Sequence, residues 1–600
     1  MLSRQFGTST QESLLTVERD PATVLNQPTW FGTAEEPLFG WLSYPQDSLI
    51  RGGVVLALPV GFEARGARKA MRALASALAQ SGYAALRFDY RGTGDSSGDF
   101  GSTLANPGWL DDVTSAVDFF RECGVRSVSA VGMRIGATLV ARAATGKQLG
   151  LGAMVLWDPC ESGRGFLREL RALETLRHEE IEEKHDGSME TAEFLLSPDM
   201  VESIRSLKLS ESAPTKCAER TLVVAREKRP LSSSLRDQFD TAGVEFKVTD
   251  EQEALIGVHP FYSQVPRDTI SLIVNWLDES GDEPSTRPQW SVRTEASLAA
   301  ADGGPRIVER AIRVGPRGLF AVTSEPQSSV AGPWIVMLSG VHEDHTGPSR
   351  LWVEVPRRWA SLGLRCLRID LSGTGESSRF AEDPPMRGND PVWIRDVNSI
   401  GPSLAPTDQS NFVYIGYCSG GFLALEGAFG SGAKGVCTIN LPSATDYSHA
   451  IWRLENHATG LATVTSTFLR RLISKYDVIG EFLWLSLSWL LPKRWSTNIM
   501  ADVMSRGTQV LAIVGPADSS PYRNVPFLRR FSNSLTRAVR PYSFTLVPTL
   551  DHDMSFATGR DDSVRQLENF VESRFAPNRP APRRDVGGDH GDHGDHDPIE

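Results

Sequence analysis

The sequence has little cysteine, and none of it has a spacing typical of metal sites or disulfide-built domains. The chain of 600 residues contains six cysteines, at positions 123, 160, 217, 366, 418 and 437, and no two of them form a CxxC pair. Disulfide-built domains and structural zinc sites both require cysteines at close, repeated spacings. We therefore expect neither, and the sequence implies no metal or organic cofactor.

A surplus of basic charge is also missing. Lys and Arg number 62 against 74 Asp and Glu, which gives a formal net charge of −12. Six of the acidic residues follow Arg584 with no Lys or Arg among them, so the rest of the chain is only mildly acidic. Proteins that bind nucleic acids carry clustered positive charge. A nucleic acid is therefore not expected as the main partner.

Long hydrophobic runs are absent as well. The most apolar segment, residues 478–491, has 14 residues and includes one Glu, whereas a membrane-spanning helix needs about 20 apolar residues. The opening residues MLSRQFGTSTQESLL lack the apolar stretch of a secretory signal. We expect no transmembrane segment and a cytoplasmic location, and the oligomeric state is left open.

What the sequence does contain is a long internal repeat. The segment SGYAALRFDYRGTGDSSG at 81–98 is matched by LGLRCLRIDLSGTGESSR at 362–379, an offset of 281 residues. Further on, SAVGMRIGATLV at 129–140 is matched by VYIGYCSGGFLA at 413–424, at an offset of 284. The offset changes by only three residues between the two matches, which a single loop insertion explains. Two copies of one large domain are the simplest account, and 40% hydrophobic residues suffice for two cores.

Composition divides the chain further. Residues 281–304 are rich in Pro, Ser, Gly and charge, which predicts a linker. The two copies then cover residues 1–280 and 305–577. Residues 578–600 contain the run DHGDHGDHD, and we expect this low-complexity tail to be disordered. Whether its histidines bind a metal is left open.

Strands alternate with helices in both copies. Apolar runs and helical periodicity predict strands at 54–60, 83–90, 334–340 and 364–370, and helices at 70–80 and 353–363. This alternation favours an α/β fold, with a mostly parallel sheet flanked by helices in each copy. A cap is expected as an insertion at about 160–215 and 441–505. Ligands of such sheets lie beyond the carboxyl ends of the strands.

The second copy contains a motif with a chemical function. A strand predicted at 411–417 leads through Gly416-Tyr-Cys-Ser-Gly420 into a predicted helix. This is the G-x-nucleophile-x-G pattern, in which a sharp turn exposes the central residue and needs small residues two positions away on either side. Cys418 has a glycine at both of these positions, whereas Ser419 has a tyrosine at one of them. Cys418 is therefore the expected nucleophile, and a helix N-terminus with a nearby histidine favours its thiolate.

An acid and a histidine follow Cys418 in the chain order that this pattern requires. Asp518 comes shortly after an apolar strand predicted at 509–515, and His552 follows a strand predicted at 544–548. We predict that His552 acts first as general base and then as general acid, and that Asp518 orients its imidazole ring.

Beyond these residues, the chain resembles two fused α/β hydrolases of the serine-aminopeptidase-like esterase and lipase group. The loops D-x-x-G-T-G-x-S-S at 89–97 and 370–378 carry this resemblance. Their GxG is interpreted as a tight turn after a strand, because the third glycine of a dinucleotide-binding fingerprint is missing. The cysteine elbow GYCSGG resembles those of dienelactone hydrolases, polyhydroxyalkanoate synthases and cysteine thioesterases.

The resemblance implies an oxyanion hole made of two backbone N–H groups. One belongs to Ser419, directly after the nucleophile, and the other to Val341 in the loop after the third strand. His342 and His345 in that loop do not form an HExxH motif. They are interpreted as loop residues near the site, not as metal ligands.

The first copy keeps the glycines of the elbow and lacks the nucleophile. Its elbow reads Gly132-Met-Arg134-Ile-Gly136, and an arginine is neither deprotonated at usable pH nor an acyl acceptor. Two interpretations of Arg134 stay open. It binds an anionic ligand, or it pairs with a nearby acid such as Asp158.

The other positions of the first copy are only partly preserved. His259 lies near the place of His552, and Glu227 lies near the place of Asp518. We predict a folded, non-catalytic hydrolase-like domain. It could serve as an interface or as a lid for the second copy.

The function predicted from these features is that of an acyl hydrolase or acyltransferase for an ester or thioester. The second cap is rich in Trp and Phe, which suggests a hydrophobic or acyl substrate, free or bound to a carrier protein. Hydrolysis and acyl transfer use the same residues and are not separated. Two alternatives stay open, namely a non-catalytic binding or scaffold protein and a lactone-cleaving enzyme for polar substrates.

Overall fold

The computed structural model describes most of both copies. The described residues are 24–46, 49–98, 108–177, 187–191, 194–212, 217–258, 260–279, 283–299, 304–327, 332–341, 343–383, 391–441, 499–519 and 542–576. Most of the second predicted cap lies outside these ranges, together with its apolar run at 478–491, and so does the predicted tail at 578–600.

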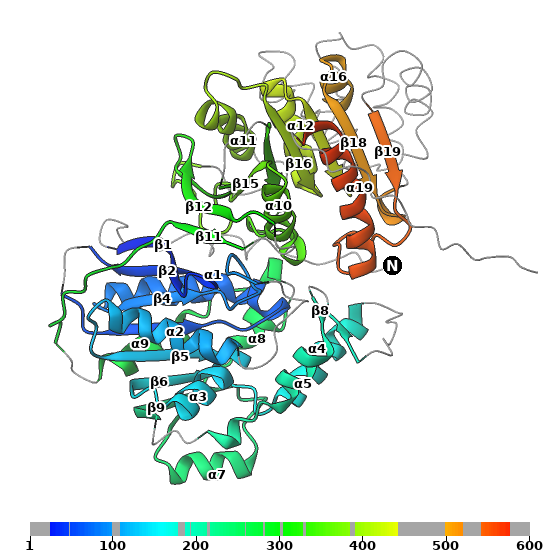
Figure 1. Cartoon of the computed structure of the whole chain (residues 1–600). Helices are drawn as coiled ribbons and strands as arrows, with labels where there is room; N and C mark the ends of the chain where they lie inside the picture. Colours follow the sequence, from blue (N-terminus) through cyan, green and yellow to red (C-terminus); the bar gives the residue numbers. More distant parts are fainter. Residues whose placement is uncertain are drawn as a thin grey trace, which may run out of the picture.

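The first copy is built on an eight-stranded sheet (Figure 1) with the order β1-β2-β4-β3-β5-β6-β9-β10. Seven of these strands run in one direction, and β2 alone runs in the opposite direction. The strands are β1 Val24–Gly32, β2 Pro37–Pro45, β3 Gly53–Ala57, β4 Ala84–Phe88, β5 Val128–Met133, β6 Leu151–Trp157, β9 Ala218–Ala225 and β10 Glu245–Val248.

The second copy repeats this sheet. Its order is β11-β12-β13-β15-β14-β16-β17-β18-β19, which from β12 onward matches the first sheet position by position, with antiparallel β13 in the place of β2. This is the strand order of the α/β-hydrolase fold, and the predicted fold class is confirmed. The strands are β11 Glu295–Leu298, β12 Ile307–Val314, β13 Leu319–Pro326, β14 Trp334–Leu338, β15 Arg365–Ile369, β16 Phe412–Tyr417, β17 Gly435–Ile439, β18 Gln509–Val514 and β19 Tyr542–Leu546.

Helices cover both faces of each sheet because alternate strand residues point to opposite sides. In β3, Val54 and Leu56 pack with helices α1 and α9, whereas Val55 and Ala57 pack with α2 and α3. In the second copy, α10 and α19 cover one face and α11 and α12 the other. The helices of the first copy are α1 Phe62–Gln80, α2 Gly108–Glu122, α3 Ile135–Lys147, α4 Gly163–Arg177, α5 Pro198–Ser206, α7 Ser233–Thr241, α8 Gln252–Ile256 and α9 Arg267–Asp278. Those of the second are α10 Leu351–Ser361, α11 Pro391–Leu404, α12 Ser419–Ser431, α16 Ile499–Ser505 and α19 Ala557–Phe575.

The insertion predicted at 160–215 is described in part. It contains α4, α5 and a short hairpin of β7 Met189–Glu190 and β8 Leu195–Leu196. In Figure 1 this insertion extends from the first copy beneath the second.

The segment predicted as a linker is more ordered than its composition suggested. The backbone N–H groups of Ile50 and Trp30 donate to the carbonyl groups of Thr286 and Arg293, at 2.8 Å each. The segment then enters the second sheet as its edge strand β11, paired with β12. The neighbouring strand supplies hydrogen-bond partners for the backbone of a segment whose own sequence does not favour a strand. The prediction that residues 281–304 are only a linker is therefore corrected here.

The two copies share an apolar cluster. Trp30, Phe39 and Trp41 of the first sheet are buried together with Phe320 and Val322 of the second. The ring centroids of Trp41 and Phe320 lie 4.8 Å apart in an edge-to-face arrangement. Because β2 and β13 occupy the same place in their sheets, corresponding strands of the two copies meet in this cluster.

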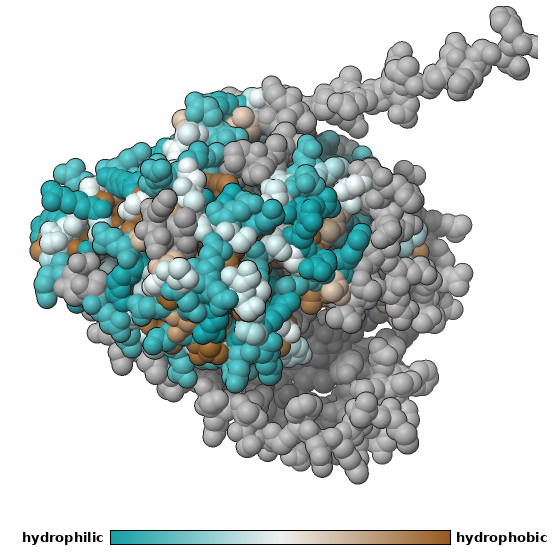
Figure 2. All heavy atoms as spheres, turned by 90° about the horizontal axis from the view of Figure 1, so that it is seen from below, coloured by the Kyte–Doolittle hydropathy of each residue, from teal (hydrophilic) through white to brown (hydrophobic). Residues whose placement is uncertain are grey.

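The face of the molecule seen from below is mostly hydrophilic. In Figure 2, apolar residues on the coloured part of this face are scattered among polar ones. Among the described residues, no helix combines the length and the apolar character that crossing a membrane demands.

Candidate active site

The elbow of the second copy is a strained turn. Cys418 lies between β16 and α12 with φ 52° and ψ −124°, a conformation that costs free energy for any residue with a side chain. Its N–H donates to the carbonyl of Ile439 at 2.9 Å, which anchors the turn to β17. Arg134 has nearly the same angles, φ 56° and ψ −124°. The turn is therefore a property of the fold, present in both copies.

The two glycines of the elbow leave room for this turn. A Cβ atom on Gly416 would collide with the carbonyl of Gly420. A Cβ atom on Gly420 would lie 2.5 Å from the carbonyl oxygen of Ser339. Both obstacles are backbone atoms, so a side chain at either position displaces Cys418 or the strand beside it.

Replacing Gly420 with alanine is expected to lower activity at least 100-fold and to destabilise the fold by about 2 kcal/mol, since overpacking against backbone is costly. Gly146→Ala is the matched control, because Gly146 lies in α3 with open space around the added carbon. That substitution should be neutral or stabilising by up to about 1 kcal/mol. Turnover and urea unfolding of both variants check the prediction, and equal behaviour would refute it.

The structure brings Cys418, His552 and Asp518 together. The sulfur of Cys418 lies 3.5 Å from Nε2 of His552, and Nδ1 of His552 lies 2.8 Å from Oδ2 of Asp518. Asp518 sits in a 3₁₀ turn, Ala517–Ser519, that follows β18. The three side chains come from the ends of three different strand–loop units, as expected for a site at the carboxyl edge of a parallel sheet.

A residue that the sequence analysis missed positions the histidine loop. The side-chain amide of Asn440 donates to the carbonyls of Asp551 at 2.8 Å and His552 at 3.0 Å. Its carbonyl oxygen accepts from the N–H of Gly515 at 2.8 Å. Asn440 therefore connects the loop of His552 to the end of β18. A lone asparagine after an apolar strand gave no signal of this role.

The electrostatics of the site favour a protonated imidazole. The hydrogen bond with the Cys418 sulfur raises the pKa of His552 to about 10. Partial burial lowers this pKa, but the hydrogen bond with the Asp518 carboxylate also raises it. Cys418 is partly exposed, whereas the other five cysteines are buried. A cysteine beside a cationic imidazolium and accessible to solvent is placed to react as a thiolate.

The loop at residues 339–347 faces the elbow. The N–H of Val341 donates to Oγ of Ser419 at 2.9 Å. A Cβ atom on Gly340 would lie 3.5 Å from Cβ of Cys418, so the loop passes directly over this cysteine. His342 lies outside the described residues. His345 points away, into the boundary between the two copies, where its Nε2 lies 2.7 Å from a carboxylate oxygen of Asp95.

The elbow of the first copy is filled by ion pairs. Arg134 is 3% exposed and pairs with Glu63 at 3.0 Å, with Asp158 at 3.4 Å, and with Glu169. Asp158 in turn pairs with Arg226 at 2.9 Å. Of the two interpretations of Arg134, this geometry favours the residue paired with nearby acids, and its guanidinium is not directed at an open anion site.

Strand register relates the end of β9 in the first copy to the end of β18 in the second. Trp157 of β6 pairs with Val224 of β9, and at the corresponding positions of the second sheet Ile439 of β17 pairs with Ile513 of β18. Five residues further on lie Arg229 and Asp518, respectively. Glu227 is an exposed residue of the turn, two positions from the place of the acid. That Glu227 lies near the place of Asp518 stays a prediction.

Among the described residues, no group of three or more His, Cys, Asp or Glu side chains is arranged so that it could hold a metal ion. His259, the predicted counterpart of His552 in the first copy, lies outside them.

Comparisons with known proteins give partial matches. No known family profile matches the chain. Over 114 residues the chain is 32% identical to the mitochondrial palmitoyl-protein thioesterase ABHD10 of Homo sapiens and 31% identical to that of Pongo abelii. Each match covers 19% of this chain and 34% of the relative. The chain thus spans about a third of the length of the curated relatives it matches.

Solved structures of esterases align with part of the chain. Est1E from Butyrivibrio proteoclasticus with bound ferulic acid aligns with 42% of this chain and 99% of its own, at 16% identity and a TM-score of 0.33. The esterase Pf2001 of Pyrococcus furiosus aligns with 44% of this chain and 95% of its own, at 14% identity and a TM-score of 0.32.

Proposed function

We propose that the chain is an acyl hydrolase or acyltransferase that cleaves an ester or thioester through Cys418, His552 and Asp518. The observation that carries this proposal is the continuous series of contacts from Asp518 through His552 to the sulfur of Cys418, at a strained turn beside a backbone N–H donor. Nucleophile, base and orienting acid stand in the relation that acyl transfer requires.

The first half-reaction forms an acyl-enzyme. The thiolate of Cys418 attacks the carbonyl carbon of the substrate, a C–S bond forms, and the carbonyl electron pair moves to oxygen. The N–H groups of Val341 and Ser419 stabilise this oxyanion. For this step, the N–H of Val341 exchanges its hydrogen bond to the Ser419 hydroxyl for one to the oxyanion. The bond from the carbonyl carbon to the leaving group then breaks, and His552 donates its proton to the departing oxygen or sulfur.

The second half-reaction releases the acyl group. His552, now neutral, takes a proton from water as the water oxygen attacks the acyl thioester. A carboxylic acid leaves, and the thiolate of Cys418 and the imidazolium of His552 are restored. An alcohol or amine in place of water gives acyl transfer by the same steps.

The proposed substrate is hydrophobic or acyl, free or bound to a carrier protein. The partial similarity to a palmitoyl-protein thioesterase supports an acyl thioester. The first copy is proposed to be non-catalytic, because Arg134 replaces the nucleophile and its guanidinium is bound by three carboxylates. We propose domain boundaries near residues 280 and 577.

Intact mass spectrometry tests the proposal. The wild type, Cys418→Ala and Ser419→Ala are each incubated with short and medium acyl thioesters and aryl esters. A mass gain of one acyl group, or turnover, is expected in the wild type and in Ser419→Ala but not in Cys418→Ala. Loss in Ser419→Ala alone would make the serine the nucleophile. Inertness of all three proteins would contradict the proposal and favour a binding or scaffold protein.

A further inference from the structure

The two copies meet through the same positions of the repeat. Arg87 of the first copy pairs with Glu376 of the second at 2.9 Å, and Arg368 of the second pairs with Asp95 of the first. Arg87 and Arg368 are 281 residues apart, and so are Asp95 and Glu376. The contact is therefore isologous, as in a twofold dimer, although both partners belong to one chain.

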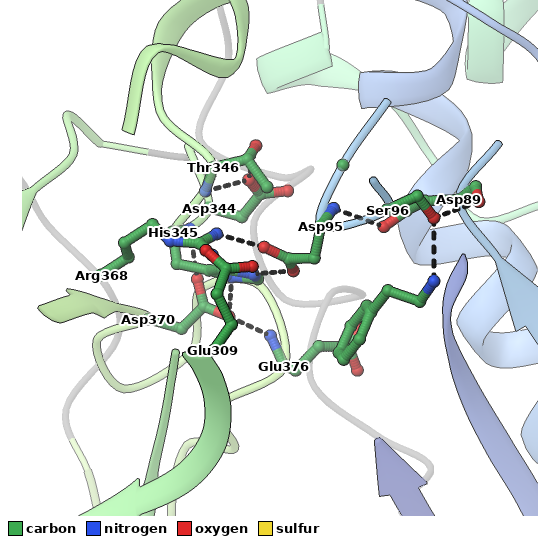
Figure 3. Close-up of polar contacts among 12 residues, drawn as sticks. Asp89, Asp95, Ser96, Glu309, Asp344, His345, Thr346, Arg368, Asp370 and Glu376 are labelled. Atoms are coloured by element: carbon green, nitrogen blue, oxygen red, sulfur yellow. Dashed lines mark hydrogen bonds and ion pairs between the residues drawn. The ribbon is translucent and has the colours of Figure 1, made fainter. Parts of the chain in front are cut away.

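A buried cluster of charged side chains lies at this contact (Figure 3). His345 lies between Asp95 and Asp370, with its ring nitrogens 2.7 and 3.0 Å from their carboxylates, and Arg368 joins Asp95 to Glu309. Burial opposes ionisation of Asp95, but His345 and Arg368 outweigh it and hold its pKa below the usual range. Asp95 of the first copy is thus paired with His345 and Arg368 of the second, which also pair with Asp370 and Glu309 of their own copy.

Other contacts do not follow the twofold relation, and they converge on the 339–347 loop. Arg65 of α1 pairs with Glu343 at 2.9 Å, and Arg68 of the same helix pairs with Asp344 at 3.0 Å. The positions in the second copy that correspond to Arg65 and Arg68, 281 residues later, are Thr346 and Ser349. At these two positions the second copy therefore has no arginines that could pair with the first copy in the same way.

The 339–347 loop is also held from within. The carbonyl of Asp344 accepts from the hydroxyl of Ser339 at 2.8 Å, and the N–H of His345 donates to Asp370 at 2.7 Å. Arg350, directly after the loop, donates to the carbonyls of Gly94, Ser96 and Gly98 at 2.6–2.9 Å. Each end of the loop is thus held by hydrogen bonds, and Arg65 and Arg68 reach its middle at Glu343 and Asp344, whose side chains are 12% and 16% exposed.

We propose that the first copy acts as a positioning domain for the oxyanion hole of the second, with Arg65 and Arg68 holding the 339–347 loop so that the N–H of Val341 points at the substrate carbonyl. This inference rests on the proposed function and assigns the non-catalytic copy a role in it. Arg65 and Arg68 are positioning residues, because their partners Glu343 and Asp344 lie two and three residues from Val341. The N–H of an oxyanion hole must be placed to within about 0.5 Å, which is why a remote support affects rate.

Arg65→Gln, Arg68→Gln and the double variant test the proposal against Arg72→Gln. Arg72 lies on the same helix and also contacts the second copy, through the carbonyl of Gly375 at 2.8 Å, but not the 339–347 loop. We expect kcat to fall about 10-fold in each single variant and up to about 100-fold in the double variant, within the loss seen when one oxyanion donor is removed. KM should stay within about 2-fold, and Arg72→Gln should match the wild type.

Two further measurements separate this proposal from the proposed function. Alkylation of Cys418 by iodoacetamide passes through no oxyanion, so its rate should be the same in all four variants and the wild type. Amide hydrogen exchange in a peptide covering 339–347 should be faster by about 10-fold in the double variant and unchanged in Arg72→Gln. Arg65→Lys should restore most of the kcat.

The outcomes are distinct. Unchanged exchange in the double variant, or an equal loss of kcat in Arg72→Gln, overturns the positioning role, whatever the reaction is. Faster exchange of the loop in the double variant, together with no acylation of Cys418 in the wild type, would support the positioning contact and contradict the proposed function.

Discussion

Replacing Cys418 or His552 with alanine is expected to lower kcat by about 10⁴- to 10⁶-fold, the range found when a member of a catalytic triad is removed. The reason is that the sulfur and the imidazole, 3.5 Å apart, act as one unit. Either loss alone removes the activated thiolate. The double variant should therefore be no slower than the worse single variant, because nothing remains for the second substitution to remove.

Steady-state turnover of an acyl thioester measures this prediction, and alkylation of Cys418 controls it. His552→Ala should also slow alkylation at neutral pH, since the imidazolium that favours the thiolate is gone. Additive losses in the double variant would contradict a shared mechanism. Full activity in His552→Ala would remove His552 from the reaction.

The pH dependence follows from the same contacts. The pKa of His552 is raised to about 10, so the ring holds the proton that it donates to the leaving group at every pH below that value. With an alkyl ester, whose leaving group needs the proton, kcat should fall about tenfold per pH unit above about pH 10. Asp518→Asn should lower the pH at which kcat begins to fall, because the Asp518 carboxylate, 2.8 Å from Nδ1 of His552, is one of the groups that raise the pKa of His552.

The second large effect concerns stability. Asp95→Ala is expected to destabilise the protein by about 3–5 kcal/mol, because it leaves the guanidinium of Arg368 and the ring of His345 buried without a common partner. Arg368 and Asp95 are 0% and 1% exposed. Asp118→Ala is the control, since its pair with Arg121 is about half exposed. That loss should cost less than about 0.5 kcal/mol.

Urea unfolding of the whole chain measures both variants. A cost below about 1 kcal/mol for Asp95→Ala would show that the buried cluster does not depend on the first copy. Glu376→Ala, which removes the partner of Arg87 at the corresponding position, should cost a similar amount if the two sides are equivalent.

The cluster also sets a pH window for stability. Burial opposes the charge on His345, but Asp370 and Asp95 outweigh it and raise the pKa of His345 well above its usual value. The stability that this ring contributes is complete below about pH 6.5, its unfolded pKa, and is lost at about 1.4 kcal/mol per pH unit as the pH rises further. For Asp95, whose pKa is lowered, the contribution is complete above about pH 4 and is lost as the pH falls. His345→Gln should remove the loss above pH 6.5 that urea unfolding detects in the wild type.

The elements and the candidate triad were both readable from local patterns. The predicted strand at 334–340 is β14, and the predicted helix at 353–363 is α10 with its start two residues earlier. Cys418, Asp518 and His552 were assigned from glycine spacing and chain order, and the structure places their side chains in contact. The strands, the helix and the elbow are predictable because strand–turn–helix geometry depends on neighbours within a few residues, and the role of the three side chains stays a prediction.

Other features could not be predicted in this way. Arg229 lies five residues after Val224, as Asp518 lies five residues after Ile513, and this relation depends on the pairing of β9 with β6, far away in the sequence. Asn440 supports the histidine loop through contacts more than 100 residues distant. The segment around 295–298 is a strand because β12 offers it backbone partners.

By itself, the sequence was enough to predict two α/β copies and, in one of them, a cysteine between the two glycines of the elbow, since periodicity, glycine spacing and residue type are local properties. Only the tertiary structure decided how the first copy contacts the second. The repeats could have been linked without touching. Instead, Arg65 and Arg68 reach the loop that carries Val341, and Asp95, Arg368 and His345 are buried together. Charge pairs between distant segments depend on how the domains pack, and the packing of two whole surfaces leaves no short pattern in a sequence.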